Sequence, residues 1–244
     1  MDIEQVRINK LLAERKVCSR READKLIAAG QILLNGQVVT EQGTKATRED
    51  LIEVAESARE AQSQKVTIML HKPLGIVSNF PEPGYKEASE LITEENHWEG
   101  DRRPFEPILE SLNVVGRLDV NSKGLLVLTQ DGRVAKQIIG PESNVEKEYI
   151  VRFQGELSNY NLMRLRDGLF LDGKRLKRAI VERKDENTLL FVLTEGKKRQ
   201  LRRMCEIIGL DVTSLKRVRV GNLQLGTLPP GKWRYIDFRE LQSF

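Results

Sequence analysis

One stretch near the middle of the chain, residues 114–132, limits the possible folds more than any other segment. Two apolar runs, Val114-Val115 and residues 125–128, flank a polar loop that contains a single carboxylate, Asp119. Short apolar runs bounded by glycine, asparagine and serine are typical of buried strands. The pattern predicts a loop held between two rigid strands, where catalytic side chains are often presented. An isolated acidic residue beside a turn is, however, most often a solvated loop residue.

The composition is that of a polar globular protein. Hydrophobic residues make up 39% and charged residues 31% of the 244 positions, enough for one large domain or two unequal ones. No apolar run approaches the roughly 18 residues of a membrane span, and the N-terminus lacks the pattern of a signal peptide. Cys18 and Cys205 form no metal-spaced pair. We expect a cytoplasmic protein with reduced cysteines and no membrane contact.

Residues 1–55 predict a small module of two helices and a β-hairpin. Its signals are an apolar helical stripe, a capping box with a glycine stop, and a tight turn: Ile8-Leu11-Leu12, Ser19–Glu22 with Gly30, and Asn35-Gly36. Basic residues outnumber acidic ones in the two helices, and the main ones are Arg7, Lys10, Arg20, Arg21 and Lys25. Ordinary solvated helix faces account for these charges as well as a phosphate-binding surface does.

This order of elements resembles the S4 RNA-binding domain. The resemblance lies in Arg7 to Leu12, Cys18 to Ala23 and Ile32 to Gly36, over about fifty residues. It implies that the module docks on structured RNA through backbone shape and charge. The basic residues named above are then candidate RNA contacts.

The rest of the chain predicts a linker and a larger domain. Residues 56–65 are small and polar without apolar periodicity, so we interpret them as a linker that allows some helix and lets the module move. Residues 66–244 alternate strand patterns with short helices and predict a mixed α+β domain with a mostly antiparallel sheet. Within it, residues 81–110 are rich in proline and glycine and predict a long irregular insertion with one short helix near residues 88–92.

A second basic cluster lies near the C-terminus. Residues 196–219 hold eight basic groups against Glu206 and Asp211 alone. Like charges at helical spacing repel each other, so a polyanion or a buried carboxylate partner explains the cluster better than a solvated face does. Within the cluster, Lys197, Lys198 and Arg203 are candidate RNA contacts.

Four motifs follow one another along the large domain: Lys72-Pro-Leu-Gly75, Gly116-Arg-Leu-Asp119, Lys147-Glu-Tyr149 and Arg199-Gln-Leu-Arg202. Together with the N-terminal module they resemble the pseudouridine synthases, in the branch that modifies ribosomal RNA and carries an N-terminal S4 domain. The resemblance covers essentially the whole chain. The continuation at residues 204–206 is most similar to members that act on large-subunit ribosomal RNA.

The resemblance implies a role for each matching residue. Asp119 matches the catalytic aspartate, Tyr149 the tyrosine that stacks on the target base, and Arg202 the basic residue that pairs with the aspartate. Leu201 matches an apolar residue of the uracil pocket, and Arg117 an arginine that holds the gap left by a flipped base. The further candidates for substrate binding are Lys72 and Arg199.

The implied reaction suits these residue types. Uridine isomerisation breaks the N1–C1′ bond, turns the uracil and rejoins it through C5, after the base has left its RNA structure at a cost of a few kcal/mol. A carboxylate suits attack or charge stabilisation at an oxocarbenium-like carbon. The reaction needs no redox change and no external group, so we expect no cofactor. His71 and His97 lack partners at metal spacing, so we expect no metal.

The expected partner is a structured stem-loop of ribosomal RNA, bound by a monomer. Three alternatives remain open: a non-catalytic RNA-binding or ribosome-assembly protein, a nucleoside hydrolase that releases free uracil, and a synthase acting on small-subunit ribosomal RNA or transfer RNA. The synthase interpretation makes one geometric prediction. Asp119 should lie within ion-pair reach of Arg202 and face the ring of Tyr149.

Overall fold

The computed structural model describes residues 4–108 and 112–241. The chain forms two compact units, Met1–Val66 with Thr129–Gln137, and Thr67–Leu128 with Ile138–Phe244. We refer to them as the N-terminal and the C-terminal unit. In the described part of the chain, no helix has the length and apolar character that crossing a membrane requires.

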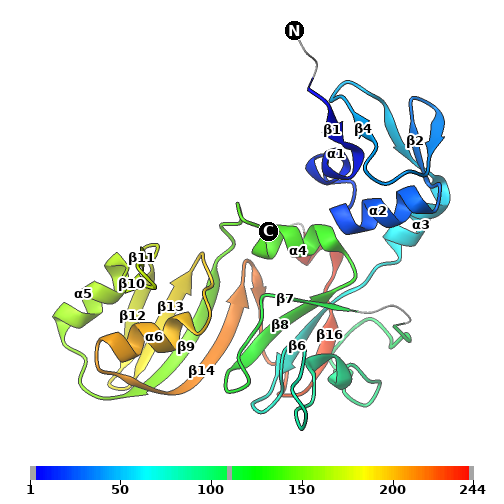
Figure 1. The fold of residues 1–244 in the computed structure, drawn as a ribbon. Helices are drawn as coiled ribbons and strands as arrows, with labels where there is room; N and C mark the ends of the chain where they lie inside the picture. Colours follow the sequence, from blue (N-terminus) through cyan, green and yellow to red (C-terminus); the bar gives the residue numbers. More distant parts are fainter. Residues whose placement is uncertain (1–3, 109–111, 242–244) are drawn as a thin grey trace. The chain divides into compact units, whose positions relative to one another are not determined.

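The N-terminal unit contains short helices and two small antiparallel sheets (Figure 1). Its helices are α1 (Ile8–Glu14), α2 (Arg20–Ala28) and α3 (Glu56–Ser63). One sheet pairs β1 (Val6–Arg7) with β4 (Lys45–Ala46), and the other has the order β3 (Gln37–Val39), β2 (Ile32–Leu34), β5 (Ile52–Val54). Apolar side chains from the helices and strands form one core, which includes Ile8, Leu11, Leu12, Ala23, Ile27 and Ile32.

The predicted helix and turn signals of this unit are present. The Ser19 hydroxyl accepts a hydrogen bond from the Glu22 backbone N–H at 3.2 Å, as expected for a helix cap. Asn35 and Gly36 both have positive φ, 51° and 81°, which is the backbone that a tight hairpin turn needs. The antiparallel pair β2–β3 follows from that turn.

Two segments of this unit go beyond the predicted module. Residues 56–65, interpreted from the sequence as a linker, contain helix α3, and Ala58 on that helix is buried in the core. Residues Thr129–Gln137 also belong to this unit. Within that segment the Lys136 amine donates to the Ala13 carbonyl at 3.0 Å, and Arg133 donates to the Val17 carbonyl at 3.4 Å. The exact boundaries of the domains remain a prediction.

The C-terminal unit is a mixed α+β domain. Its first half contains β6 (Thr67–Lys72), a 3₁₀ helix η1 (Ala88–Leu91), β7 (Asn113–Val115), β8 (Lys123–Thr129) and the end of α4 (Gly132–Ile139). The remaining elements are β9 (Lys147–Gln154), α5 (Asn159–Asp167), β10 (Phe170–Leu171), β11 (Lys174–Arg175), β12 (Ile180–Asp185), β13 (Thr188–Leu193), α6 (Gln200–Ile207), β14 (Asp211–Val220), β15 (Leu223–Gln224), β16 (Trp233–Tyr235) and α7 (Phe238–Leu241).

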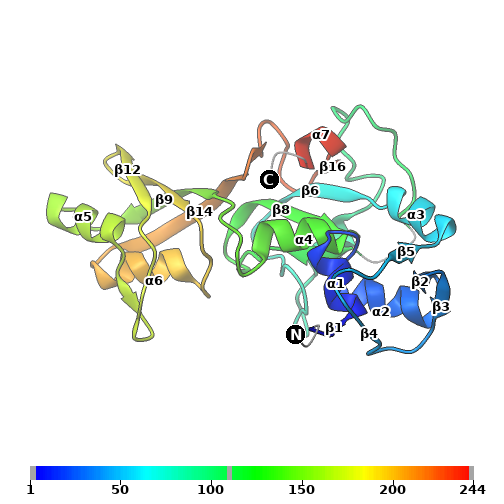
Figure 2. The same cartoon turned by 90° about the horizontal axis from the view of Figure 1, so that it is seen from above.

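One large sheet runs through this unit in the order β12-β13-β9-β14-β8-β6-β16 (Figure 2). The pairs from β12 to β14 are antiparallel, as is β16 with β6. Strand β14 joins β8 in parallel through a short contact, Lys216 with Lys123 and Arg217 with Gly124. The prediction of a mixed α+β fold with a mostly antiparallel sheet is confirmed. The short parallel junction was not predicted.

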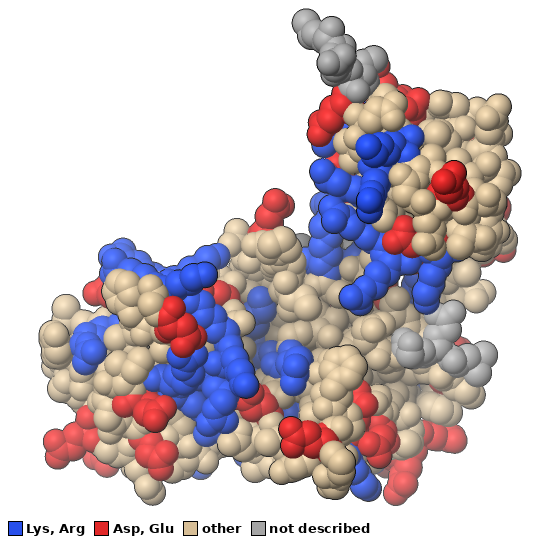
Figure 3. Space-filling model, in the orientation of Figure 1, with Lys and Arg blue, Asp and Glu red and all other residues tan. Residues whose placement is uncertain are grey.

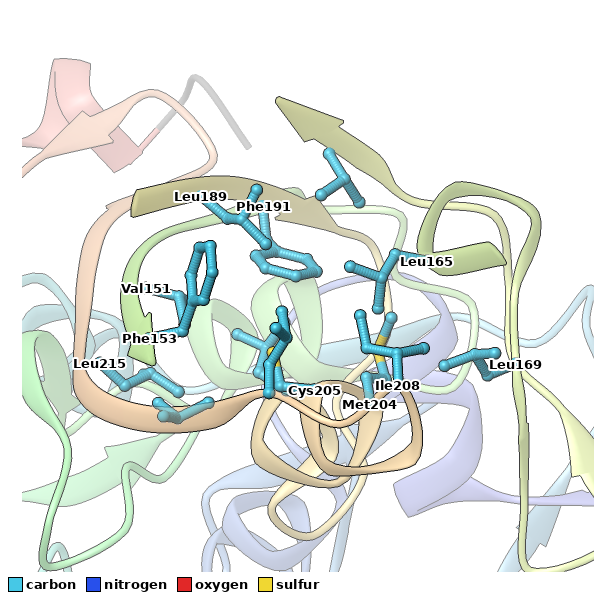
Figure 4. Close-up of a cluster of buried hydrophobic side chains, with 14 of the residues drawn as sticks. Val151, Phe153, Leu165, Leu169, Leu189, Phe191, Met204, Cys205, Ile208 and Leu215 are labelled. Carbon is cyan, nitrogen blue, oxygen red and sulfur yellow. The ribbon is translucent and has the colours of Figure 1, made fainter. Parts of the chain in front are cut away.

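Helices α5 and α6 cover one face of the β12-β13-β9-β14 half of the sheet. Between them lies a core of fully buried side chains, among them Val151, Phe153, Leu165, Phe191 and Met204 (Figure 4). Cys205 is buried here and Cys18 in the N-terminal unit, and both are free thiols, as predicted. This core fixes strand β9 and helix α6, which carry Tyr149 and Arg202.

The predicted insertion is folded against strand β16, and the short helix predicted near residues 88–92 is present as η1. The His97 ring lies 4.6 Å from Trp233 and 5.6 Å from Tyr235, measured between ring centroids. The His97 Nε2 is 3.0 Å from Asp101 Oδ2, and Asp101 accepts the Tyr235 N–H at 2.7 Å. Residues 76–78 form no strand, and Val77 forms only an isolated bridge with Glu87. Residues 109 and 110 of the predicted insertion lie outside the described residues.

Candidate active site

A cavity of about 840 Å³ in the C-terminal unit collects most of the predicted site residues. It lies among the β7–β8 loop, the start of β9 and the segment that joins β13 to α6. The predicted residues that line it are Arg117, Asp119, Tyr149, Lys197, Lys198, Arg199, Leu201 and Arg202. The fold therefore brings together motifs that are separated by more than eighty positions in the sequence.

Asp119 is half-buried on the β7–β8 loop, which backbone hydrogen bonds hold in place. The buried Ser78 hydroxyl donates to the Leu118 carbonyl at 2.6 Å and accepts the Leu118 N–H at 2.9 Å. On the other side, the Gly75 N–H donates to the Val120 carbonyl at 2.9 Å. Both neighbours of Asp119 are thus fixed, which limits the movement of its carboxylate. Ser78 lies outside the recognised motifs, and no sequence signal marks it.

Arg202 does not form the predicted ion pair with Asp119. No nitrogen of Arg202 lies within 4.0 Å of the Asp119 carboxylate. Instead its guanidinium donates to the Asn121 carbonyl at 2.7 Å and to the Val212 carbonyl at 3.1 Å. Backbone carbonyls therefore accept from the two terminal nitrogens of the guanidinium, and Arg202 holds the loop two residues after the aspartate. Its Nε is buried without a hydrogen-bond partner.

The electrostatic coupling between the two residues persists at this longer range. Burial and the neighbouring Arg199 lower the pKa of Arg202, whereas the negative charge of Asp119 acts to raise it. An arginine stays protonated under such shifts, so it keeps its positive charge. Asp119 is thus attracted by a cation that its carboxylate does not contact.

Tyr149 projects from strand β9 into the same cavity. It lies in register with Phe191 on one neighbouring strand and Arg217 on the other. The ring is half-buried and packs against the core that contains Val151 and Phe153. Whether its face is turned toward Asp119 stays a prediction.

Two buried cations at the cavity were not assigned a role from the sequence. Arg217 is only 3% exposed; it donates to the Leu125 and Gly116 carbonyls, each at 2.7 Å. Lys147 donates to the Ile138 carbonyl at 2.9 Å, and burial lowers the pKa of its amine to about 8. Lys216 and Arg219 lie on the same strand, so no local sequence pattern singles out Arg217.

Lys72, a candidate for substrate binding, lies outside the residues that line the cavity. It is fully buried, does not line the cavity, and donates to the Pro73 and Ile76 carbonyls at 2.9 and 2.7 Å. Burial lowers the pKa of Lys72 to about 8, and the Asp119 charge acts in the opposite direction. The structure does not bring Lys72 to the cavity wall, and its contact with substrate stays a prediction. Its amine fixes the turn whose Gly75 holds the Asp119 loop.

Asn79 is a cavity residue that the sequence did not indicate. Its side-chain Oδ1 is buried and has no hydrogen-bond partner. A buried carbonyl oxygen without a donor is unfavourable by about 1–3 kcal/mol. The position is consistent with an acceptor that a bound ligand would satisfy.

The predicted RNA contacts lie on two surfaces. Arg7, Lys10 and Arg20 line a hollow of about 270 Å³ in the N-terminal unit, and Arg21 and Lys25 are exposed. On the C-terminal unit, basic side chains gather over the half that carries α5, α6 and β12–β14 (Figure 3). Those predicted here are Lys197, Lys198 and Arg203. Arg203 is held by the Asp172 carboxylate at 2.6 and 2.9 Å, which weakens its case as a free phosphate contact.

Metal ligation finds no support at this site. Among the described residues, no three His, Cys, Asp or Glu side chains gather in a way that would hold a metal ion. The His71 Nδ1 lies 2.7 Å from the Leu228 carbonyl oxygen, and His97 belongs to the aromatic group on β16. Both histidines therefore contact groups of the fold and lie in no cluster of metal ligands among the described residues.

Comparison with known proteins agrees with this geometry. The family described as RNA pseudouridylate synthase matches residues 66–207, and the S4 domain family matches residues 6–52. A crystal structure of a pseudouridylate synthase superimposes with a TM-score of 0.67 at 25% identity, covering 98% of this chain and 99% of that one.

Curated relatives match over nearly the full length. An uncharacterized RNA pseudouridine synthase of Aquifex aeolicus is 37% identical, over 97% of this chain and 92% of its own. The dual-specificity RNA pseudouridine synthase RluF of Escherichia coli K12 is 34% identical over 97% and 77%. The ribosomal large subunit pseudouridine synthase B of Bacillus subtilis is 32% identical over 97% and 94%. This chain therefore belongs to the RNA pseudouridine synthases that carry an N-terminal S4 domain, and it is an isomerase that modifies RNA.

Proposed function

We propose that this enzyme converts a specific uridine of large-subunit ribosomal RNA to pseudouridine in the cytoplasm, with Asp119 as the catalytic carboxylate. The observation that carries the site assignment is the cavity in which Asp119, Tyr149 and Arg202 meet from three distant segments. A cavity of about 840 Å³ has the size of a typical small-molecule site and accommodates a flipped nucleotide.

In this proposal Asp119 acts at C1′ of the target ribose. A carboxylate attacks an electron-poor sugar carbon or stabilises its positive charge while the N1–C1′ bond breaks. Either route requires a carboxylate whose position does not drift. The Ser78 and Gly75 hydrogen bonds to the flanking residues provide that rigidity.

Tyr149 and Leu201 hold the uracil while it is detached. The ring of Tyr149 offers a flat surface, and base–aromatic stacking contributes about 1–3 kcal/mol. Leu201 is buried at the cavity wall and supplies apolar contact. The uracil can then turn in its plane and present C5 to C1′ without leaving the site. Arg117 is exposed at the cavity and is placed to fill the gap in the RNA left by the flipped base.

The RNA specificity is supported by the relatives and by the charge distribution. The Bacillus subtilis relative carries a name that assigns it to the large ribosomal subunit. The Escherichia coli relative is named as having dual specificity, so a second RNA class is the alternative for this chain. Under either substrate, the S4 domain binds RNA through Arg7, Lys10, Arg20, Arg21 and Lys25.

Chemical mapping of pseudouridine in cells with and without this protein tests the proposal. Ribosomal and transfer RNA are treated with carbodiimide and the positions of the adducts are read by reverse transcription. We expect one site, or a few neighbouring sites, in large-subunit ribosomal RNA to lose its signal without the protein and to regain it on re-expression. A loss confined to transfer RNA or small-subunit ribosomal RNA would contradict the substrate, and no change in any RNA would contradict the activity in these cells.

A further inference from the structure

Phe80 combines exposure and an unfavourable backbone in a way that no packing role explains. Its side chain is 84% exposed, the highest value among the large hydrophobic residues that the structure describes as exposed. Its φ is +54°, a region that costs free energy for any residue with a Cβ. Backbone strain of this kind persists where the surroundings impose it, and it clusters at functional sites.

The position of Phe80 ties it to the active-site cavity. It directly follows Asn79, which lines the cavity, and it comes two residues after Ser78, which holds the backbone of Leu118. Two peptide units span at most about 7.6 Å between Cα atoms, so the Phe80 Cα lies within that distance of the Ser78 Cα. Pro81 follows and restricts the backbone further. The Phe80 backbone is thus close to the loop that presents Asp119.

The surroundings indicate what the ring contacts. The cavity is lined by eight Lys and Arg side chains against the carboxylates of Asp119 and Glu195, and four of the eight, Arg117, Lys177, Lys198 and Arg199, are exposed. Such an excess of positive charge fits a phosphate backbone. An exposed aromatic ring on the residue after Asn79 of the cavity wall fits a nucleobase, because every base has a face that stacks on an aromatic ring.

We propose that the Phe80 ring stacks on an unpaired base of the substrate RNA next to the flipped uridine, and so positions the strand at the mouth of the cavity. This inference rests on the proposed site at Asp119. It assigns to Phe80 a positioning role, distinct from the contact of Tyr149 with the target base itself.

Three substitutions separate the ring from the backbone strain. Phe80→Gly removes the ring and relieves the positive φ, Phe80→Trp keeps a stacking surface, and Phe170→Ala removes an equally simple ring that is 66% exposed and does not line the cavity. The substrate is total RNA labelled with [5-³H]uridine, taken from cells that lack this protein. Tritium release gives kcat/KM, and thermal unfolding gives Tm.

We expect Phe80→Gly to lower kcat/KM about 5-fold to 100-fold, the range that the loss of one stacked base implies, while its Tm is equal to or above that of the wild type. Phe80→Trp should stay within about threefold of the wild type, and so should Phe170→Ala. In Phe80→Trp, addition of the same RNA without label should quench fluorescence beyond the change that Trp98 and Trp233 give in the wild type.

Wild-type kcat/KM in Phe80→Gly, or no added quenching in Phe80→Trp, would overturn the stacking role. A failure of the proposed function has a different signature, since the wild type would then release no tritium. In that case the fluorescence measurement still decides whether RNA contacts the ring.

Discussion

Arg202 acts on the loop that carries Asp119 through backbone carbonyls and not through the Asp119 carboxylate. Its guanidinium donates to the Asn121 carbonyl at 2.7 Å, and hydrogen bonds to charged groups contribute about 1.5–3 kcal/mol. The hydrogen bond to the Asn121 carbonyl therefore sets the position of the guanidinium, and its positive charge acts on Asp119 from there. A sequence motif reveals that an arginine and an aspartate belong to one site. It does not reveal whether their side chains touch, because that depends on which acceptors the folded loop offers.

The buried side chains of Lys147 and Arg217 hold backbone carbonyls at the cavity, a role that the sequence did not predict. Arg217 fixes Gly116 and Leu125 at the two ends of the loop region. Its role depends on contacts about one hundred positions away, which no local pattern contains. Lys147 was part of a recognised motif, but its burial is visible only in the structure.

Lys147 makes the stability of the enzyme depend on pH in the alkaline range. Burial, together with the positive charges of Arg217 and Lys177, lowers its pKa in the folded protein to about 8, against about 10.4 in an unfolded chain. Between these values the unfolded state binds more protons, so stability rises with pH. Below pH 8 both states are protonated and the burial penalty is fully present.

Urea unfolding of the wild type and Lys147→Met from pH 7 to pH 10 measures this effect. The free energy of unfolding of the wild type minus that of the variant should stay level up to about pH 8 and then rise, by at most about 1.4 kcal/mol per pH unit. A difference that is constant across the range, or that falls, would show that the amine is not buried as described.

At the scale of elements, the sequence predicted features that depend on neighbouring residues and did not predict contacts between distant segments. The Ser19 cap and the Asn35-Gly36 turn were predicted, because each depends on residues within a few positions. The parallel junction between β14 and β8 was not, since it joins strands about ninety positions apart through a short contact. The same limit applies to the aromatic group that folds the insertion onto β16.

The β14–β8 junction predicts a strict requirement for glycine at position 124. Its φ is +112°, and a Cβ there would lie 2.2 Å from the Arg217 carbonyl oxygen, a backbone atom that cannot turn away. Gly124→Ala should lower the free energy of unfolding by more than about 3 kcal/mol, since strain and a forced separation of the strands add.

Gly173→Ala is the matched control for this substitution. Gly173 also has a positive φ, +72°, but a Cβ added there would meet no atom within 4 Å, so only the backbone cost of about 1–2 kcal/mol applies. Urea unfolding of both variants gives the comparison. Equal losses in the two would show that the strands do not approach closely at Gly124.

At the scale of the whole molecule, the chain joins a unit that carries the S4 domain to a unit that carries the catalytic cavity. The sequence predicted both units and their order, because each has its own motifs. It did not predict that residues 129–137, from the middle of the catalytic sequence, belong to the N-terminal unit. Contacts such as Lys136 to the Ala13 carbonyl have no counterpart in hydrophobic periodicity.

The proposed RNA contacts of the S4 domain predict how salt affects RNA binding. Replacing Arg20, Arg21 and Lys25 by glutamine should reduce the slope of log K against log salt concentration by about 0.7–0.9 for each charge that contacts a phosphate. Filter binding of total RNA at about 50–300 mM potassium chloride gives the slope. Arg59→Gln, on helix α3 and 3.9 Å from Glu56, should leave it unchanged. An unchanged slope in the triple variant would remove the RNA-contact role of these residues.

The assignment of Asp119 is tested most directly by tritium release from RNA labelled with [5-³H]uridine, comparing the wild type with Asp119→Asn. The substitution keeps the size of the side chain and removes its charge, and the Ser78 and Gly75 hydrogen bonds to the neighbouring residues are preserved. We expect RNA affinity and the free energy of unfolding close to those of the wild type, with tritium release reduced to the background without enzyme. Release at the wild-type rate would contradict the account.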